Sequence, residues 1–162
     1  MIRTVDTLLS VCKKLRTKTD WDEYEILVDE KTTDENEDTY EETVNDNPYF
    51  SVQVDMLNST DSFKLREKLI NIYIYYIDAR NGNNRSERKL DVMDNLTELF
   101  DSSIQIDESY LPIIRKDYLD NNSIFKMTIK YYDNKSIENI PIEDKWDELM
   151  EVIKVKYKVK EA

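Results

Sequence analysis

The sequence predicts an α+β protein in which a mostly antiparallel sheet carries two main helices packed on it. Two stretches show apolar residues at three- and four-residue spacing, the pattern of an amphipathic helix. Several others are short, rich in β-branched and aromatic residues and bounded by polar turn residues, as strands are. The chain has 162 residues, 40% of them hydrophobic, so we expect residues 1–162 to form a single domain with a modest core.

The first predicted element is a helix over Thr4–Arg16. Its apolar residues share one face: Val5, Leu8, Leu9, Val11, Cys12 and Leu15. We interpret Cys12 as a small buried hydrophobic residue rather than a reactive thiol. A short strand is predicted next, over Tyr24–Val28.

Residues 29–47 form an acidic segment. Nine Asp and Glu stand against the single base Lys31, a local charge of −8. With few apolar residues, the segment is expected to be a mobile loop or a β-excursion whose shape depends on a partner, unless it is simply a solvated loop that aids solubility. The carboxylates expected to line a lumen or face a partner are Asp34, Glu35, Glu37, Asp38, Glu41 and Glu42.

Two strands and a helix are predicted in the middle of the chain. Residues 48–56 alternate apolar and polar side chains, the polar residues Asn58–Asp61 predict a turn, and the β-formers of Phe63–Ile77 predict one long strand. A helix follows over Arg85–Phe100, where Asn84 and Glu87 resemble a capping box. Its apolar face comprises Leu90, Met93, Leu96, Leu99 and Phe100.

A β-hairpin is predicted over Leu111–Leu119 and Ile124–Tyr132, because Asn-rich turn residues join two β-rich runs. A short apolar stretch at Ser103–Ile106 precedes it. Tyrosines gather in the predicted strands, as at Tyr73 and Tyr75. We interpret them as aromatic pairs that stabilise a sheet, since a base-stacking platform needs a basic groove and this protein is acidic.

The C-terminal residues combine two patterns. Trp146, Leu149, Met150 and Ile153 have helical spacing over a short window, whereas residues 151–162 predict a strand by strict alternation. The apolar face of that strand and two of its lysines are the candidate subunit-interface residues: Ile153, Val155, Tyr157, Val159, Lys154 and Lys156. An unpaired apolar strand joins either the subunit's own sheet or that of a neighbour, and both options stay open here.

The composition excludes several chemistries. With no His, one Cys and one Gly, the chain cannot build a Ser-His-Asp triad, a His-ligated zinc site, an internal disulfide or a glycine-rich phosphate loop. Asp91 and Asp94 lie three apart on a predicted helix, but no third ligand accompanies them, so we interpret them as part of a solvated face. We expect no catalysis, no metal and no cofactor.

The charge balance excludes other partners. The 23 Lys and Arg against 35 Asp and Glu give a net charge of −12, which repels phosphate and disfavours sequence-specific nucleic-acid binding. No run of 18 apolar residues predicts a membrane span, and the N-terminus lacks a secretory apolar region. An intracellular product is expected.

The order of the predicted elements resembles the tail terminator proteins of tailed phages and of phage-tail-like bacteriocins. The resemblance rests on stretches at matching places in the order: Tyr24–Val28, Asn47–Val52, Ile72–Tyr76, Arg88–Leu96 and the hairpin Pro112–Tyr132. It implies a small α+β protein that forms a hexameric ring on the tail tube, stops tube polymerisation and forms the head-proximal neck. The implied partners are other copies of itself, tube proteins, sheath proteins in a contractile tail and, in a phage, the head connector. The resemblance also implies that the protein assembles in the bacterial cytoplasm and is present in the mature virion or tail-like particle.

Two other classes fit the composition. A small acidic inhibitor that mimics DNA would place its carboxylates in the basic groove of a partner and remain small in solution. A carboxylate-only metal-dependent hydrolase would be stabilised sharply by Mg²⁺ or Mn²⁺.

Overall fold

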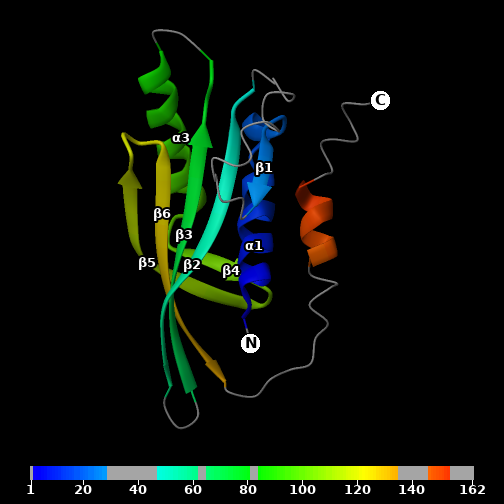
Figure 1. Cartoon of the computed structure of the whole chain (residues 1–162), viewed down its shortest axis with the longest axis vertical. Helices are drawn as coiled ribbons and strands as arrows, with labels where there is room; N and C mark the ends of the chain where they lie inside the picture. The colour runs from blue at the N-terminus through cyan, green and yellow to red at the C-terminus, as the bar shows by residue number, and fades with distance from the viewer. Residues whose placement is uncertain (1, 29–46, 62–64, 81–83, 135–145, 154–162) are drawn as a thin grey trace, which may run out of the picture.

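The computed structural model describes residues 2–28, 47–61, 65–80, 84–134 and 146–153 (Figure 1). It confirms the α+β fold. The elements run in the order α1 (Thr4–Arg16), the 3-10 turn η1 (Thr19–Trp21), β1 (Glu25–Val28), β2 (Tyr49–Asp61), β3 (Leu65–Ile77), α3 (Arg85–Leu99), β4 (Ser103–Ile106), β5 (Ser109–Leu119) and β6 (Ile124–Asn134). A further short helix spans residues 146–153.

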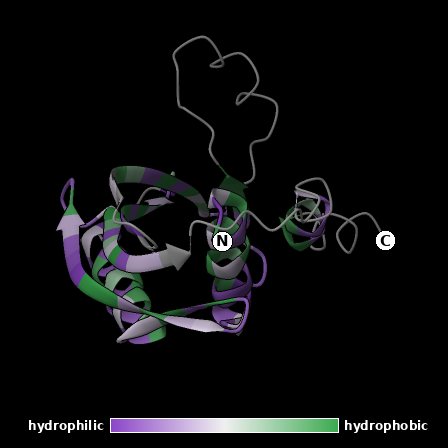
Figure 2. Ribbon diagram, turned by 90° about the horizontal axis from the view of Figure 1, so that it is seen from below, coloured by the Kyte–Doolittle hydropathy of each residue, from purple (hydrophilic) through white to green (hydrophobic). Residues whose placement is uncertain are grey.

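The described strands form one six-stranded sheet in the order β1-β2-β3-β6-β5-β4. Every pairing is antiparallel except that of β1 with β2, which is parallel. The sheet curls, and both main helices lie within the curl (Figure 2). Helix α1 contacts β2 near one edge and β4 at the other, so it closes the open side of the curl.

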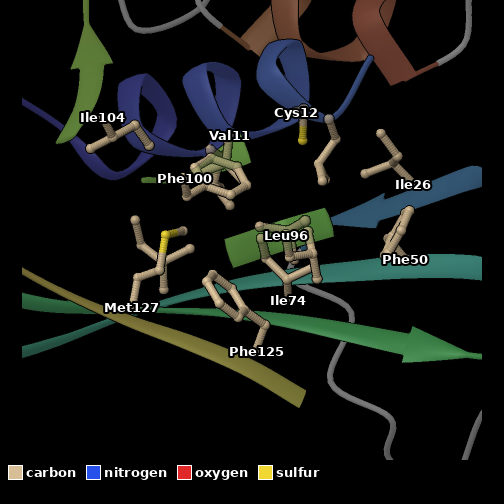
Figure 3. Close-up of a cluster of buried hydrophobic side chains, with 14 of the residues drawn as sticks. Val11, Cys12, Ile26, Phe50, Ile74, Leu96, Phe100, Ile104, Phe125 and Met127 are labelled. Atoms are coloured by element: carbon tan, nitrogen blue, oxygen red, sulfur yellow. The ribbon is translucent and has the colours of Figure 1, made fainter. Parts of the chain in front are cut away.

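The core lies between the helices and the concave face of the sheet (Figure 3). On β3 every second residue points inward, and Ile70, Ile72 and Ile74 lie opposite inward-facing residues of β6. The helices contribute Val11 and Leu96, among others, both of which are completely buried. The predicted face of α1 is therefore confirmed as a core face. On α3, Met93 and Leu96 are buried as expected, but Leu90 is 49% exposed and Val92 is buried in its place.

Helix α1 is buried more widely than one apolar face requires. Asp6 and Thr7 are buried as well as Leu8 and Val11. Helix 146–153 lies beside α1 (Figure 1), and Lys13 Nζ donates to Glu148 Oε1 at 2.5 Å. Leu149 of that helix is 1% exposed and belongs to the same core. The spacing that begins at Trp146 is therefore helical, and residues 151–153, which were expected to begin a strand, are its last turn.

Two local predictions are wrong. The expected turn at Asn58–Asp61 is a continuation of β2, because Arg66–Leu69 of β3 supply partners for it after a bulge between Met56 and Asn58. The expected capping box is absent because Asn84 has φ −97° and ψ 13° rather than the extended backbone of a capping residue, and its side chain makes no cap hydrogen bond.

The β5–β6 hairpin is confirmed. Its turn holds Asp120, Asn121 and Asn122 in the left-handed region at φ 51°, 54° and 63°. Asp and Asn tolerate this region better than other residues with a Cβ, which explains the Asn-rich turn. The Ser123 hydroxyl donates to the Asp120 carbonyl at 2.6 Å and closes the turn.

Candidate interaction surfaces

A buried carboxylate ties the end of β3 to the start of α3. The Asp78 side chain is fully buried and accepts hydrogen bonds from Tyr76 Oη (3.0 Å), from Arg80 Nε and Nη2 (3.0 Å each) and from Arg88 Nε (2.9 Å). Arg88 Nη2 also donates to the Arg80 carbonyl at 3.0 Å. The cluster therefore holds Asp78 and Arg80, which follow β3, against Arg88 of α3 in a defined arrangement.

The electrostatics of this cluster favour the ionised carboxylate. Burial alone would raise the pKa of Asp78, but the hydrogen bonds from Arg80, Arg88 and Tyr76 outweigh it and hold the pKa well below its usual range. Burial, together with the bond to Asp78, raises the pKa of the Tyr76 phenol. The cluster around Asp78 is therefore charged and structural, and no two of its groups are set to exchange a proton near neutral pH.

The outer face of the sheet carries a tyrosine surface, which we define as Tyr73, Tyr75 and the groups that contact them. The two rings lie 6.4 Å apart, and Lys126 Nζ lies 5.9 Å from the centroid of Tyr73. Tyr75 Oη donates to Gln53 Oε1 at 3.4 Å across strands. On the inner face, Tyr76 packs against Phe50 on the neighbouring strand at 5.8 Å, the kind of cross-strand pair expected from the sequence.

A buried polar pair lies on the same outer face. Thr128 Oγ1 donates to Asn71 Oδ1 at 2.7 Å between β6 and β3, and both residues are buried. Sequence patterns missed this pair, because a polar residue at an outward strand position is expected to be solvated. The bond fixes the register of β3 against β6 beneath the tyrosines.

The sheet has two terminal strands, and they differ. Beside β4, a groove of about 470 Å³ runs along α1 and is lined by Leu9, Lys13, Ile104 and Tyr110, among others. At the opposite end of the strand order, β1 pairs with β2 on one side only among the described strands. Open strand edges are natural sites for pairing with another chain.

The family model for phage tail terminator proteins matches residues 28–141. The chain belongs to the phage tail terminator protein family. It is therefore a structural protein of a phage tail, a component of the virion that contacts other tail components. This family is structural rather than enzymatic. The predicted resemblance to the tail terminator family is confirmed.

Other comparisons add little to the family assignment. No curated protein matches the chain. One matching solved structure has a TM-score of 0.43 and 10% sequence identity, and the match covers 86% of this chain and 100% of that chain.

The structure places few of the candidate residues of this family member. Of the candidate interface residues, Ile153 is described: it is half-buried at the end of helix 146–153 and packs against the core. The others, Lys154, Val155, Lys156, Tyr157 and Val159, lie outside the described residues, as do all six candidate carboxylates between Asp34 and Glu42.

The described residues hold no group of three or more His, Cys, Asp or Glu placed to bind a metal ion. Asp91 and Asp94 are exposed on α3. None of the described helices is long and apolar enough to span a membrane.

Proposed function

We propose that this protein caps the tail tube as a ring of six copies, ends tube polymerisation and forms the head-proximal end of the tail. The observation that carries the proposal is the family match over residues 28–141. The copy number comes from the resemblance to ring-forming terminators. Tube protein is the proposed partner below the ring, with sheath protein beside it in a contractile tail and the head connector above it in a phage.

The surface of the subunit supports a ring built from repeated head-to-tail contacts. Such contacts join two different surfaces of the same chain. The two sheet edges β1 and β4 are distinct, and exposed apolar side chains lie on separate elements, with Met56 and Leu57 on β2 and Ile114 on β5. These exposed apolar side chains are available to be buried at such contacts.

Two segments complete the proposal. The acidic segment faces the lumen or a partner, where like charge keeps passing DNA from adhering if the particle carries DNA. The C-terminal residues 153–159 lie at a subunit contact. Each subunit carries −12, so neighbouring copies repel one another, and the ring depends on local contacts between opposite charges and on salt.

The test is deletion of this gene from its phage, followed by electron microscopy of the tails. Loss of a length-limiting ring gives tubes of abnormal and variable length, and the wild-type protein supplied in trans restores the normal length. Sedimentation of the purified protein with tube ends measures the ring directly. Tails of normal length after deletion contradict the proposal, as does a protein that stays monomeric with tube ends and binds a basic partner instead.

A further inference from the structure

Three strands of the sheet project past the described helices as an arm, which we define as residues 56–61 of β2, 65–69 of β3 and 130–134 of β6 (Figure 1). Met56 stands on the inner row of β2, opposite the buried Ile70, yet it is 52% exposed because no described helix covers the sheet there. Leu57, the extra residue of the bulge, is 51% exposed. The arm therefore carries two adjacent large apolar side chains in solvent.

The arm is fixed to the body of the subunit. Lys68 and Tyr131 face inward on neighbouring strands of the arm, and both are buried. Lys68 Nζ donates to the Ile2 carbonyl at 3.5 Å, and Tyr131 Oη donates to the same carbonyl at 3.3 Å. The Lys68 ammonium also lies 5.8 Å from the centroid of the Tyr131 ring. An arm held in place in this way loses little conformational entropy when a partner binds it.

The groove between α1 and β4 offers a receiving surface of matching chemistry. Its volume of about 470 Å³ lies within the range of roughly 300–1,000 Å³ that is usual for pockets that enclose mainly apolar ligands. Leu9, Phe100 and Ile104 supply apolar lining, and Tyr110 adds a ring that is 70% exposed. The groove is therefore large and apolar enough for a pair of aliphatic side chains.

The charges of the arm and of the groove allow two copies to meet there. The arm contains three bases and three acids, and the charged residues that line the groove are Lys13, Lys14 and Asp107, with Glu148 bound to Lys13. Both surfaces are therefore close to neutral in a subunit that carries −12. Two acidic copies repel each other least where neutral surfaces meet. Asp55, exposed just before the arm, and Lys14, exposed on the groove, are then free to pair across the contact.

We infer that the arm of one copy inserts Met56 and Leu57 into the groove between α1 and β4 of the neighbouring copy. The inference rests on the proposed ring. The groove of the same subunit is not the receiving one, because the arm is fixed through Ile2 and none of the described arm residues lines that groove. Arm and groove are different surfaces of one chain, so each copy inserts one arm and receives one, the head-to-tail contact that a closed ring repeats.

The test uses a mixture of two single-cysteine variants and a short bismaleimide cross-linker. Ser59→Cys places a thiol on the arm and Gln105→Cys places one on the groove, both at exposed positions. The variants carry tags of different mass, so a denaturing gel identifies their heterodimer, which forms only between copies. Ser86→Cys, exposed at the start of α3, replaces Gln105→Cys in the matched control. Wild-type protein is the blank, because Cys12 is buried.

Rings that give the heterodimer of the arm and groove variants, with at least tenfold less product in the Ser86→Cys control, support the inference. Rings that give no such heterodimer overturn it and leave the proposed function intact. Cross-linking of the arm to tube protein in place of a neighbouring copy also overturns it. Absence of rings in the wild-type protein with tube ends overturns the proposed function, which separates the two failures.

Substitution of the inserted leucine is a second readout. Leu57→Asp is expected to weaken ring association at least tenfold, because the contact then buries a carboxylate in an apolar groove. Leu90→Asp, at a leucine of α3 that is 49% exposed, is the matched control and leaves association unchanged. Wild-type association of Leu57→Asp, with folding intact by circular dichroism, overturns the inference.

Exchange of the two exposed charges tests the orientation of the contact. Asp55→Lys is expected to weaken association roughly threefold at low salt, and adding Lys14→Glu to the same chain restores it, because opposite charges face each other again between copies. Circular dichroism of each variant checks that folding is intact. A double variant that associates no better than Asp55→Lys overturns the inference.

Discussion

Arg88 Nε lies 2.9 Å from Asp78 Oδ2, joining two residues ten apart in the sequence across the loop between β3 and α3. The carboxylate is fully buried, whereas the guanidinium groups of Arg80 and Arg88 are partly exposed. Removing the carboxylate therefore leaves two cations at a partly buried site with no counter-charge.

Asp78→Asn is expected to lower the free energy of unfolding by about 3 kcal/mol at pH 7, measured by urea denaturation. Asp117→Asn is the matched control, because the Arg115–Asp117 pair at 2.9 Å involves an arginine that is 72% exposed, and such surface pairs contribute under about 1 kcal/mol. Equal losses in the two variants would contradict a structural role for the Asp78 cluster.

The same cluster predicts a pH dependence. The folded-state pKa of Asp78 is lowered, so its contribution is fully present above the unfolded pKa of about 3.9 and is lost as pH falls toward the folded pKa. The difference in unfolding free energy between wild type and Asp78→Asn is expected to be constant from pH 5 to 7 and to shrink below about pH 4. A difference that grows on acidification would reverse the assigned sign.

Leu96→Asp is expected to abolish folding. Leu96 is completely buried, and an unpaired carboxylate there costs on the order of 5 kcal/mol, comparable with the whole stability of a small domain. Leu90→Asp on the same helix is the control, because Leu90 is 49% exposed. If the Leu96→Asp variant melts cooperatively at the wild-type temperature, α3 is not part of the core.

Cys12 is expected to resist thiol reagents in the folded protein. It is completely buried, and burial raises the pKa of its thiol to about 12, so the thiol is almost entirely protonated and unreactive at pH 8. Ellman's reagent should label it only at the rate of unfolding, and immediately in 8 M urea. Rapid labelling without denaturant would show that α1 opens locally.

The hairpin turn predicts opposite effects for two substitutions. Asn121→Val places a β-branched residue at φ 54° and is expected to destabilise the protein by roughly 1–2 kcal/mol, whereas Asn121→Gly is expected to change stability by less than about 0.5 kcal/mol. Urea titration of both variants measures the difference. Equal stability of the two would mean that the turn rearranges at no cost.

Elements whose sequence pattern reflects burial of one face in the core were predictable. The bounds of the first helix are those expected, Thr4–Arg16, because its inward face is continuous. β3 was expected as one long strand because its residues are dense in β-formers. The left-handed turn at Asp120–Asn122 was predictable because Asn and Asp mark that backbone region.

Features that depend on contacts distant in sequence were not predictable. The last residues of β2 look like a turn until Arg66–Leu69 pair with them, and Asp78 looks like a loop residue until Arg88 reaches it. The end of helix 146–153 was taken for a strand because Ile153 satisfies the helical and the alternating pattern equally well, and packing against the core decides between them. Of the six candidate interface residues, which were chosen from the sequence pattern, only Ile153 lies among the described residues.

The placement of α1 also determines when this protein finishes folding. Lys13 of α1 contacts Glu148, 135 residues later in the chain, and β3 pairs with the distant β6. Contacts so remote in sequence slow folding, because the chain loses the entropy of closing a long loop before the contact contributes its stabilising free energy. During synthesis, α1 leaves the ribosome first, yet part of its surface stays uncovered until helix 146–153 arrives, so a partly made chain exposes apolar surface that a chaperone or a neighbouring nascent chain can bind.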